Sequence, residues 1–415
     1  MGRGLFSAIR FAVVAVLAAG AVSGLIRLYA PALGTGSAAE RQLTFLRAEL
    51  DHGAGETAQG LFPEGYFFLH ALYGIAWVDV GRHRTDRAPA LREARWALSR
   101  LDGPQGTAPF SAELSPAHGA FYAGWTNWLR GGILSLQPAS DREPADVERF
   151  ERGSREIAAA FDASDTPFLQ AYPGQSWPVD STVAIASLRL HDAVRPALYG
   201  QTVARWVDRA RGRLDPATGL LPHVTDPATG EPLQGARASS QSVIQRFLAD
   251  IDPGFAREQY LRFRELFVVR PLGLGPAVRE YPQGTDGGGD VDSGPLPLGV
   301  SLSATVVTIG AAVVQGDRSL AAALSSYGEL AGVPIDTTRT KRYALGLLPI
   351  GDAFLVWART AEPWVAPPPS PPPPVIGPVW RIPLTLVLAL LVIPLAVVVR
   401  RHRKAERANP RPGGP

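Results

Sequence analysis

The sequence predicts an all-α fold of about twelve helices, with a short β-hairpin and a membrane segment at each end. Apolar residues recur at helical spacing from Ser37 to Thr360. Aspartates beside proline or glycine interrupt that pattern at positions where turns are expected. An uncharged apolar run lies near each terminus, and 46% hydrophobic with 19% charged residues is typical of a globular body plus membrane segments.

The N-terminal segment, residues 1–30, predicts either a membrane anchor or a signal peptide. Two arginines, Arg3 and Arg10, precede its apolar run. The small residues Ala19-Gly20-Ala21 are typical of the end of a cleavable signal peptide, whereas a run extended to Leu28 would remain as a membrane helix. Both alternatives leave the residues that follow on the exported side.

Near the other end, residues 379–400 predict a transmembrane helix. Its 18 uncharged residues from Ile382 to Val399 are just sufficient, since about 20 residues cross a hydrocarbon core of ~30 Å. A basic tail, 401–415, follows. Because lysine and arginine flanks stay in the cytoplasm, the sequence predicts a cell-membrane protein with an extracytoplasmic main domain and a cytoplasmic C-terminal tail.

Between the main domain and this helix lies a proline-rich linker, residues 361–378. Proline runs adopt polyproline II, which rises about 3.1 Å per residue and has no internal hydrogen bonds. An extended linker would hold the folded body roughly 25–30 Å off the bilayer. We therefore expect a stalk between body and membrane.

The amino-acid composition excludes several kinds of functional site and one class of partner. The chain has no cysteine, which excludes disulfides, thiolate metal sites and cysteine nucleophiles. Its pI near 9.3 derives from the basic flanks. The flanks, residues 1–10 and 400–415, carry a net charge of +7, so the overall net charge of +3 leaves about −4 for the rest of the chain. A slightly acidic body predicts no nucleic-acid partner, because nucleic-acid binding needs a basic patch.

The spacing of the helices predicts their arrangement. About 330 residues hold twelve helices, or about 55 residues for each pair, which favours six helical hairpins in a ring, an (α/α)6 toroid spanning residues 37–360. A two-layer helical solenoid is the alternative, but no repeat of 30–50 residues supports it. The predicted helices cover 37–52, 57–81, 87–102, 118–135, 144–162, 178–192, 197–212, 236–251, 254–269, 296–315, 317–331 and 344–359.

A short repeated sequence lies between two of the predicted helices. The sequence Asp-Pro-Ala-Thr-Gly occurs at 215–219 and again at 226–230. Asp-Pro and Thr-Gly are turn formers. We therefore predict two turns that bracket a short strand pair around residues 220–224.

The sequence lacks four common catalytic motifs. These are the Walker-type phosphate-binding loop, the glycine fingerprint of dinucleotide-binding proteins, the His-Glu-x-x-His zinc motif and the Gly-x-Ser-x-Gly nucleophile elbow. Polar clusters on long loops ahead of helices remain. The first contains Trp177 and Asp180 at the start of a predicted helix, where backbone amides favour an anionic side chain. These two residues either form part of a functional site, or Asp180 simply caps the N-terminus of the helix.

The second cluster is the glycine-rich loop 280–295, which holds Glu280, Tyr281, Asp290 and Asp292. Crowded carboxylates repel, so some must be protonated, hydrogen-bonded or paired with a cation. Oxygen ligands on alternate residues suit calcium, but the spacing departs from the EF-hand pattern, so we predict no cofactor, with calcium as the minor alternative. The plain alternative is a solvated loop with Asp292 as a helix cap.

A third cluster joins His223, in the turn element, to Ser239 and Ser240, which open the next helix. A lone histidine is usually structural, and His223 becomes a candidate wall or proton donor only in suitable geometry. A fourth, weaker set is Glu64, Tyr66, Trp125 and Trp128, whose aromatics at helical spacing are more typical of a core.

The order of these motifs resembles a known superfamily. Trp177-Pro-Val-Asp180-Ser-Thr, Thr218-Gly-Leu-Leu-Pro-His223, Ser239-Ser-Gln and Gly289-Asp-Val-Asp292-Ser-Gly-Pro each precede a helix. Over residues 40–360 the chain resembles bacterial (α/α)6-toroid proteins of the six-hairpin glycosidase type, a superfamily that also holds linalool dehydratase-isomerase-like proteins. Those last enzymes rely on cysteines, and this chain has none.

The resemblance implies a site at the start of the inner helices. It would gather Trp177, Asp180, His223, Tyr281, Asp290 and Asp292. Asp180 and Asp292 would be an acid/base pair, Asp290 and His223 would be the other catalytic candidates, and the two aromatics would pack on a sugar. Fold alone does not establish the reaction.

These observations lead to one principal expectation. We expect a membrane-tethered protein, glycoside hydrolase- or lyase-like, acting on a polysaccharide or small polar substrate by paired-carboxylate chemistry. The alternatives are a non-catalytic binding or assembly module of cell-envelope polysaccharide biogenesis and a purely structural scaffold.

Overall fold

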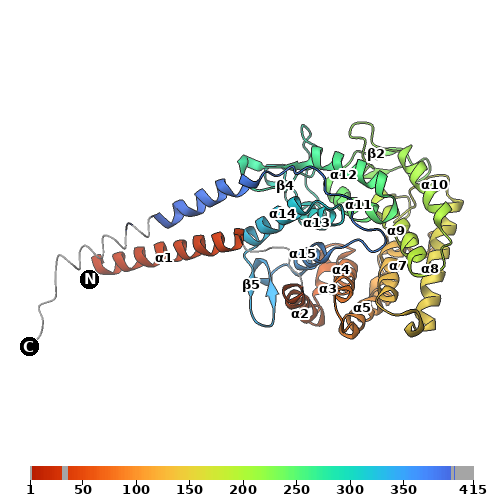
Figure 1. Cartoon of the computed structure of the whole chain (residues 1–415), viewed down its shortest axis with the longest axis horizontal. Helices are drawn as coiled ribbons and strands as arrows, with labels where there is room; N and C mark the ends of the chain where they lie inside the picture. The colour runs from red at the N-terminus through yellow and green to blue at the C-terminus, as the bar shows by residue number, and fades with distance from the viewer. Residues whose placement is uncertain (1, 30–35, 394–396, 398–415) are drawn as a thin grey trace, which may run out of the picture.

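The structure, a computed structural model, describes residues 2–29, 36–393 and 397. It consists of a rounded helical body from one end of which two helices project (Figure 1). Within the described residues, strands are limited to three short antiparallel pairs. The predicted all-α fold class is therefore confirmed.

Six helices form an inner ring. Each packs on the next one along the chain, and the last packs back on the first. These inner helices are apolar on nearly every side, so they are buried almost throughout their length. They are α4 (Gly65–Arg82), α7 (Gly119–Ser135), α9 (Pro178–Val194), α11 (Ala238–Ile251), α13 (Leu302–Val314) and α15 (Pro349–Thr360).

A second layer of helices covers the outside of this ring. Its members are amphipathic: in α8, for example, Phe150, Ile157 and Phe161 form the buried stripe that the sequence predicts. Each outer helix packs on an inner neighbour. They are α2 (Ser37–Asp51), α5 (Ala88–Leu101), α8 (Pro144–Ala163), α10 (Gly200–Arg211), α12 (Pro253–Phe267) and α14 (Arg318–Ala331).

Three predicted helices have different bounds. The segment predicted at 57–81 divides at Pro63 into α3 (Ala54–Leu61) and α4. The helices predicted from 296 and 344 begin instead at Leu302 and Pro349. In both cases a 3₁₀ turn containing a left-handed leucine precedes the helix. A short helix, α6 (Pro104–Thr107), was not predicted.

The predicted hairpin is present but displaced along the chain. β1 (Val224–Thr225) pairs with β2 (Pro232–Gln234), and the second Asp-Pro-Ala-Thr-Gly sequence forms the connection. The placement of the strand pair around 220–224 is therefore wrong. Two further pairs were not predicted: β3 (Val268–Val269) with β4 (Ala277–Val278), and β5 (Ile335–Asp336) with β6 (Lys341–Arg342).

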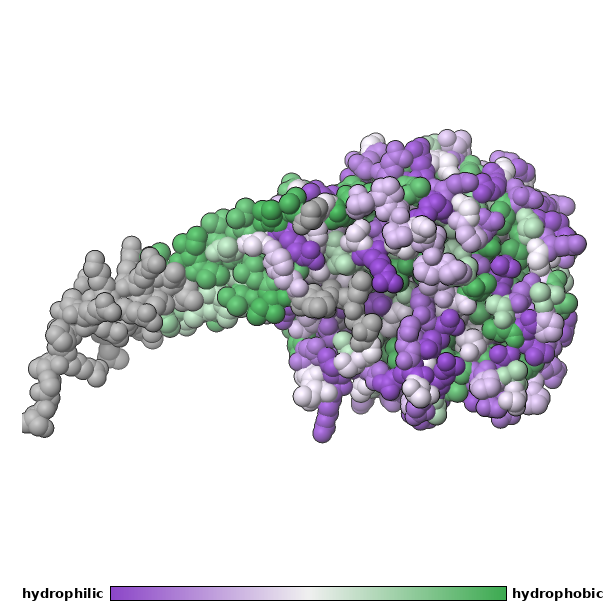
Figure 2. Space-filling view, in the orientation of Figure 1, coloured by the Kyte–Doolittle hydropathy of each residue, from purple (hydrophilic) through white to green (hydrophobic). Residues whose placement is uncertain are grey.

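The two projecting helices are α1 (Gly2–Tyr29) and a C-terminal helix (Val379–Ile393). Of the described helices, α1 alone is long and apolar enough to cross a membrane, over Phe11–Tyr29. The helices lie side by side, with 2.9 Å between the hydroxyls of Tyr29 and Thr385, and their surface is mostly apolar (Figure 2). Apart from residue 397, the end of the predicted 379–400 span lies outside the described residues, as does the 401–415 tail.

The proline-rich linker does not form a stalk. It runs back along the body, where Arg264 Nη1 donates to the carbonyl of Pro373 (3.0 Å) and Arg257 donates to that of Ser370. Polyproline II leaves its carbonyls without internal partners, so arginines on α12 can bind them. The expectation of a free, extended linker is therefore wrong.

The end of the ring at which the inner helices terminate is closed by Trp364, which directly follows α15. Its ring stacks on that of Trp128, with centroids 4.7 Å apart, and its Nε1 donates to Asp79 at 2.7 Å. The backbone amide of Trp364 also donates to the buried carboxylate of Asp250. Buried polar groups require such partners, and here the linker supplies them to the ring.

Asp79→Asn is expected to gain stability relative to the wild type as the pH rises from about 4 to about 8. Burial raises the pKa of Asp79 to about 8, although Arg246 partly opposes the change. An aspartate in an unfolded chain has a pKa of about 3.9. The folded protein therefore keeps a proton that the unfolded chain releases, and stability is lost as the pH rises toward 8, by up to about 1.4 kcal/mol per unit.

Thermal unfolding of wild type and Asp79→Asn at pH 5, 7 and 9 checks this. The wild-type Tm should decline relative to that of the variant as the pH rises. A Tm difference that stays constant across the three pH values would contradict the expectation.

Candidate functional site

The candidate residues meet at the end of the ring where the inner helices begin. Glu64 directly precedes α4, Asp180 lies in the first turn of α9, Ser239 opens α11, and Asp292 lies on the loop that leads to α13. The N-terminal ends of these inner helices therefore lie at the same end of the ring. Long loops before each inner helix supply the polar side chains, as the sequence predicts.

Asp180 is buried and its carboxyl group has no protein partner. The residue is only 5% exposed, and its carboxyl group makes no hydrogen bond or ion pair within the described part of the chain. The start of α9 has no side-chain cap, so the helix-cap interpretation of Asp180 is wrong. Burial raises the pKa of Asp180 well above its usual value, and the charges of Asp292 and Glu64 raise it further.

Asp292 has a different environment. Asp292 is exposed to solvent, yet the surrounding protein is dense enough that desolvation raises its pKa to about 6, with smaller contributions from Asp290 and Glu64. Its carboxylate does not cap α13, because Ser301 accepts from the amide of Ala304 in that position. Asp292 thus loses its proton at a lower pH than Asp180, and its charge then opposes ionisation of Asp180.

An aromatic pair flanks these carboxyl groups. The hydroxyl of Tyr172 donates to Glu64, and burial together with this bond raises the pKa of the phenol. Trp177, half-buried at the start of α9, meets Tyr172 edge to face with ring centroids 5.8 Å apart. The charges of Asp180 and Asp292 also act on Tyr172, so the aromatic pair and the carboxyl groups occupy one region.

Arg237 organises the rest of the site. Its Nε contacts Glu280 at 2.9 Å and its Nη1 contacts Asp290 at 2.7 Å. The guanidinium carbon lies 5.3 Å from the centre of the Tyr281 ring, and Ser239 Oγ donates to Glu280 at 2.7 Å. One cation therefore pairs with two of the crowded carboxylates, whereas among the described residues Asp180 and Asp292 form no ion pair.

The same arginine determines the state of Asp290. Burial acts to raise the pKa of Asp290, but hydrogen bonds from Arg237 and Ser293 outweigh it and lower the pKa to about 2. A carboxylate so stabilised is a poor proton donor or acceptor near neutral pH. Asp290, expected among the catalytic residues, is thus a counter-ion of Arg237.

His223 is buried beside this network. Its Nδ1 lies 2.6 Å from Ser240 Oγ, and its Nε2 lies 3.5 Å from Arg237 Nη1. Burial and the positive charge of Arg237 lower the pKa of His223 to about 4. The imidazole is therefore neutral at physiological pH, which suits a positioning residue better than a proton donor.

The nine residues expected from the sequence thus belong to the candidate site at the end of the ring where the inner helices begin, and contacts around Arg237 join six of them. Three members were not among them: Tyr172, Glu64, which was assigned to a weak aromatic set, and Arg237. A signal for Arg237 exists in the sequence, because it stands directly before the Ser239-Ser240 helix start and an acidic site needs a cation.

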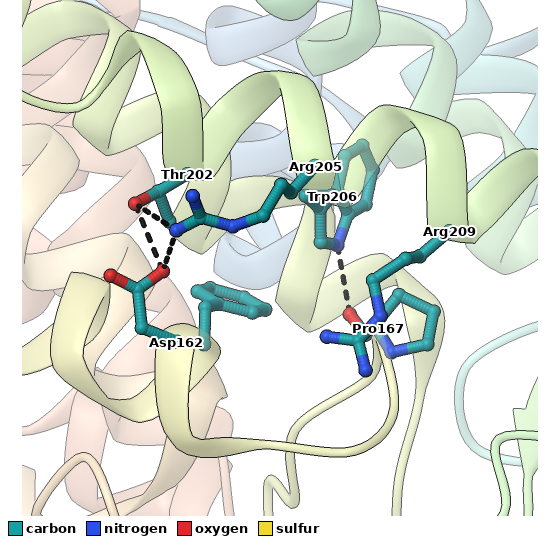
Figure 3. A pocket seen from close by; sticks show the side chains of 7 residues that line it. Asp162, Pro167, Thr202, Arg205, Trp206 and Arg209 are labelled. Atoms are coloured by element: carbon teal, nitrogen blue, oxygen red, sulfur yellow. Dashed lines mark hydrogen bonds and ion pairs between the residues drawn. The ribbon is translucent and has the colours of Figure 1, made fainter.

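A small hollow on the outside of the ring, with a cavity volume of about 10 Å³, contains none of these residues (Figure 3). It lies between α8 and α10, where Asp162 pairs with Arg205 at 2.5 Å and Trp206 Nε1 donates to Pro167 at 2.8 Å. These contacts hold the two outer helices together. We therefore assign this region a structural role in the packing of α8 against α10.

The described residues contain no group of three or more histidine, aspartate or glutamate side chains arranged to hold a metal ion. The side chains of the site themselves offer a buried acid, a second carboxyl group of lower pKa, and an aromatic pair. In comparisons with known proteins, no family model and no curated protein matches the chain.

Proposed function

We propose that this protein is a membrane-anchored enzyme that hydrolyses a glycan by paired-carboxylate acid/base chemistry. The observation that carries the proposal is the pair Asp180 and Asp292. Neither side chain has a hydrogen-bond partner among the described residues, and their environments separate their pKa values. Two carboxyl groups in different protonation states are what glycosidic cleavage requires.

The roles follow from the protonation states. Asp180, protonated, donates its proton to the glycosidic oxygen as the bond to the anomeric carbon breaks. Asp292, ionised above pH 6, accepts a proton from the water whose oxygen bonds to that carbon. Trp177 and Tyr172 offer an aromatic face to a sugar ring. The neighbouring Arg237 network fixes the loop that carries Asp292.

Two further features support the proposed location. The pairing of α1 with the C-terminal helix fits a two-helix anchor, with Arg3 and Arg10 and the basic tail on the cytoplasmic side. Leu28 is fully buried in the body, which favours retention of α1 over its removal as a signal peptide. The body would then be extracytoplasmic, where cell-envelope glycans are found.

The experiment is a hydrolysis assay on the full-length protein in lipid nanodiscs. A panel of neutral, amino and acidic polysaccharides is incubated with it, and new reducing ends are quantified across pH 4 to 9. We expect activity on at least one polymer, with an acid limb near pH 6 as Asp292 becomes ionised. Binding to a polymer without cleavage at any pH would overturn the hydrolase and favour the binding or assembly module.

A further inference from the structure

Three turns of the same design carry exposed leucines. Leu272, Leu298 and Leu345 each precede a glycine, and each has a positive φ, of 52°, 55° and 60°. Their exposed fractions are 82%, 63% and 61%. A positive φ is strained for leucine, and an exposed leucine contributes little to the core. The repetition of two unfavourable features points to a function outside the fold itself.

Two more leucines extend this surface. Leu347 and Leu348 are exposed beside Leu345, just before α15. We call the set the leucine rim; its members are Leu272, Leu298, Leu345, Leu347 and Leu348. Soluble surfaces scatter single apolar residues, whereas large side chains gathered on loops at one end of a ring indicate contact with another apolar phase.

The position of α1 shows which end of the body faces its anchor. Gly24 lies against Leu330, while Leu28 is linked through Arg381 to Ser326. The later residue of α1 therefore lies beside the earlier residue of α14, so the two helices are antiparallel. Because α1 begins far from the body and ends on it, the C-terminal end of α14 points along the projecting helices (Figure 1).

The turns of the rim attach to that same end of α14. The amide of Ala344 donates to Gly332 at 2.9 Å, and Gly275, close to Leu272, packs on Tyr327. β4 and β5, which belong to the loops bearing the rim, lie at the end of the body that α1 meets (Figure 1). The exposed leucines and the apolar helices therefore share one side of the molecule.

We propose that the leucine rim rests in the interfacial layer of the bilayer that holds α1. The partner is a lipid surface because the apolar helices leave the body beside the rim, and the linker that returns along the body provides no stalk to separate them. Apolar side chains on loops insert favourably into this layer. Since residues 268–301 carry Leu272, Leu298 and Asp292, and provided the proposed hydrolase is correct, the site acts on glycan held at the membrane surface.

Site-specific fluorescence can test this without any substrate. The chain has no cysteine, so Leu272→Cys and Leu345→Cys give uniquely labelled proteins. Each full-length variant carries the fluorophore NBD and is reconstituted in phosphatidylcholine vesicles with or without doxyl-labelled lipid. The matched control is Leu198→Cys, which is 69% exposed at the opposite end of the ring, between α9 and α10.

We expect doxyl lipid to reduce emission at least twofold at positions 272 and 345 and to leave position 198 unchanged. Equal emission with and without the quencher at both rim positions would overturn the proposal, as would equal quenching at all three positions. Retained helical circular dichroism establishes that each variant is folded. Quenching without glycan hydrolysis would leave the rim intact and refute the hydrolase alone.

Discussion

Asp180→Asn is expected to reduce glycan hydrolysis by about 10²- to 10⁴-fold while leaving the fold intact, because an amide cannot donate the proton that the leaving oxygen needs. The substitution is nearly isosteric. It also removes a buried acid whose pKa is raised by burial and by the charges of Asp292 and Glu64. An isolated buried carboxylate is costly, so the variant should be more stable than the wild type above neutral pH.

Asp292→Asn should cause a loss of similar size, because the water would no longer have a base. Asp286→Asn is the matched control: Asp286 lies on the same loop, but its side chain is 87% exposed and pairs only with Arg279 in the described chain. Initial rates and Tm values of the three variants separate the outcomes. Full activity in either Asp180→Asn or Asp292→Asn would exclude the acid/base pair.

The fold could be predicted largely because its inner and outer helices differ in apolar pattern. Helical spacing of apolar residues located the ring members, and the outer stripe of Phe150, Ile157 and Phe161 is a direct instance. What periodicity could not predict was local geometry set by proline and by tertiary contact. Pro63 divided one helix, and two others began later because left-handed leucines occupy the expected first turn.

The site could be predicted as a set of loops but not as a set of roles. Composition marked Asp180, Asp290 and Asp292 alike, since all three are aspartates near a helix start. Their different chemistry depends on Arg237, which pairs with Asp290, whereas the other two form no ion pair among the described residues. Sequence spacing does not reveal which carboxylate an arginine will pair with, because that choice is made by distance in the folded protein.

Trp364→Ala is expected to destabilise the protein by about 3–5 kcal/mol, the usual cost of deleting a large aromatic side chain from a core. The residue looks like part of a linker, yet it stacks on Trp128 and donates Nε1 to Asp79. Its removal would leave a cavity at the closed end of the ring and a buried acid without its donor. Chemical denaturation of the full-length protein in detergent measures the change in the free energy of unfolding.

Two controls separate these contributions. Trp364→Phe keeps an aromatic ring but loses the Nε1 donor, so it should cost about 1–3 kcal/mol, whereas Val365→Ala, at the half-buried neighbour, should cost less than Trp364→Ala. If all three variants were equally stable, the linker would be a passive tether. A large effect confined to Trp364 would instead mean that the segment between ring and membrane is part of the folded body.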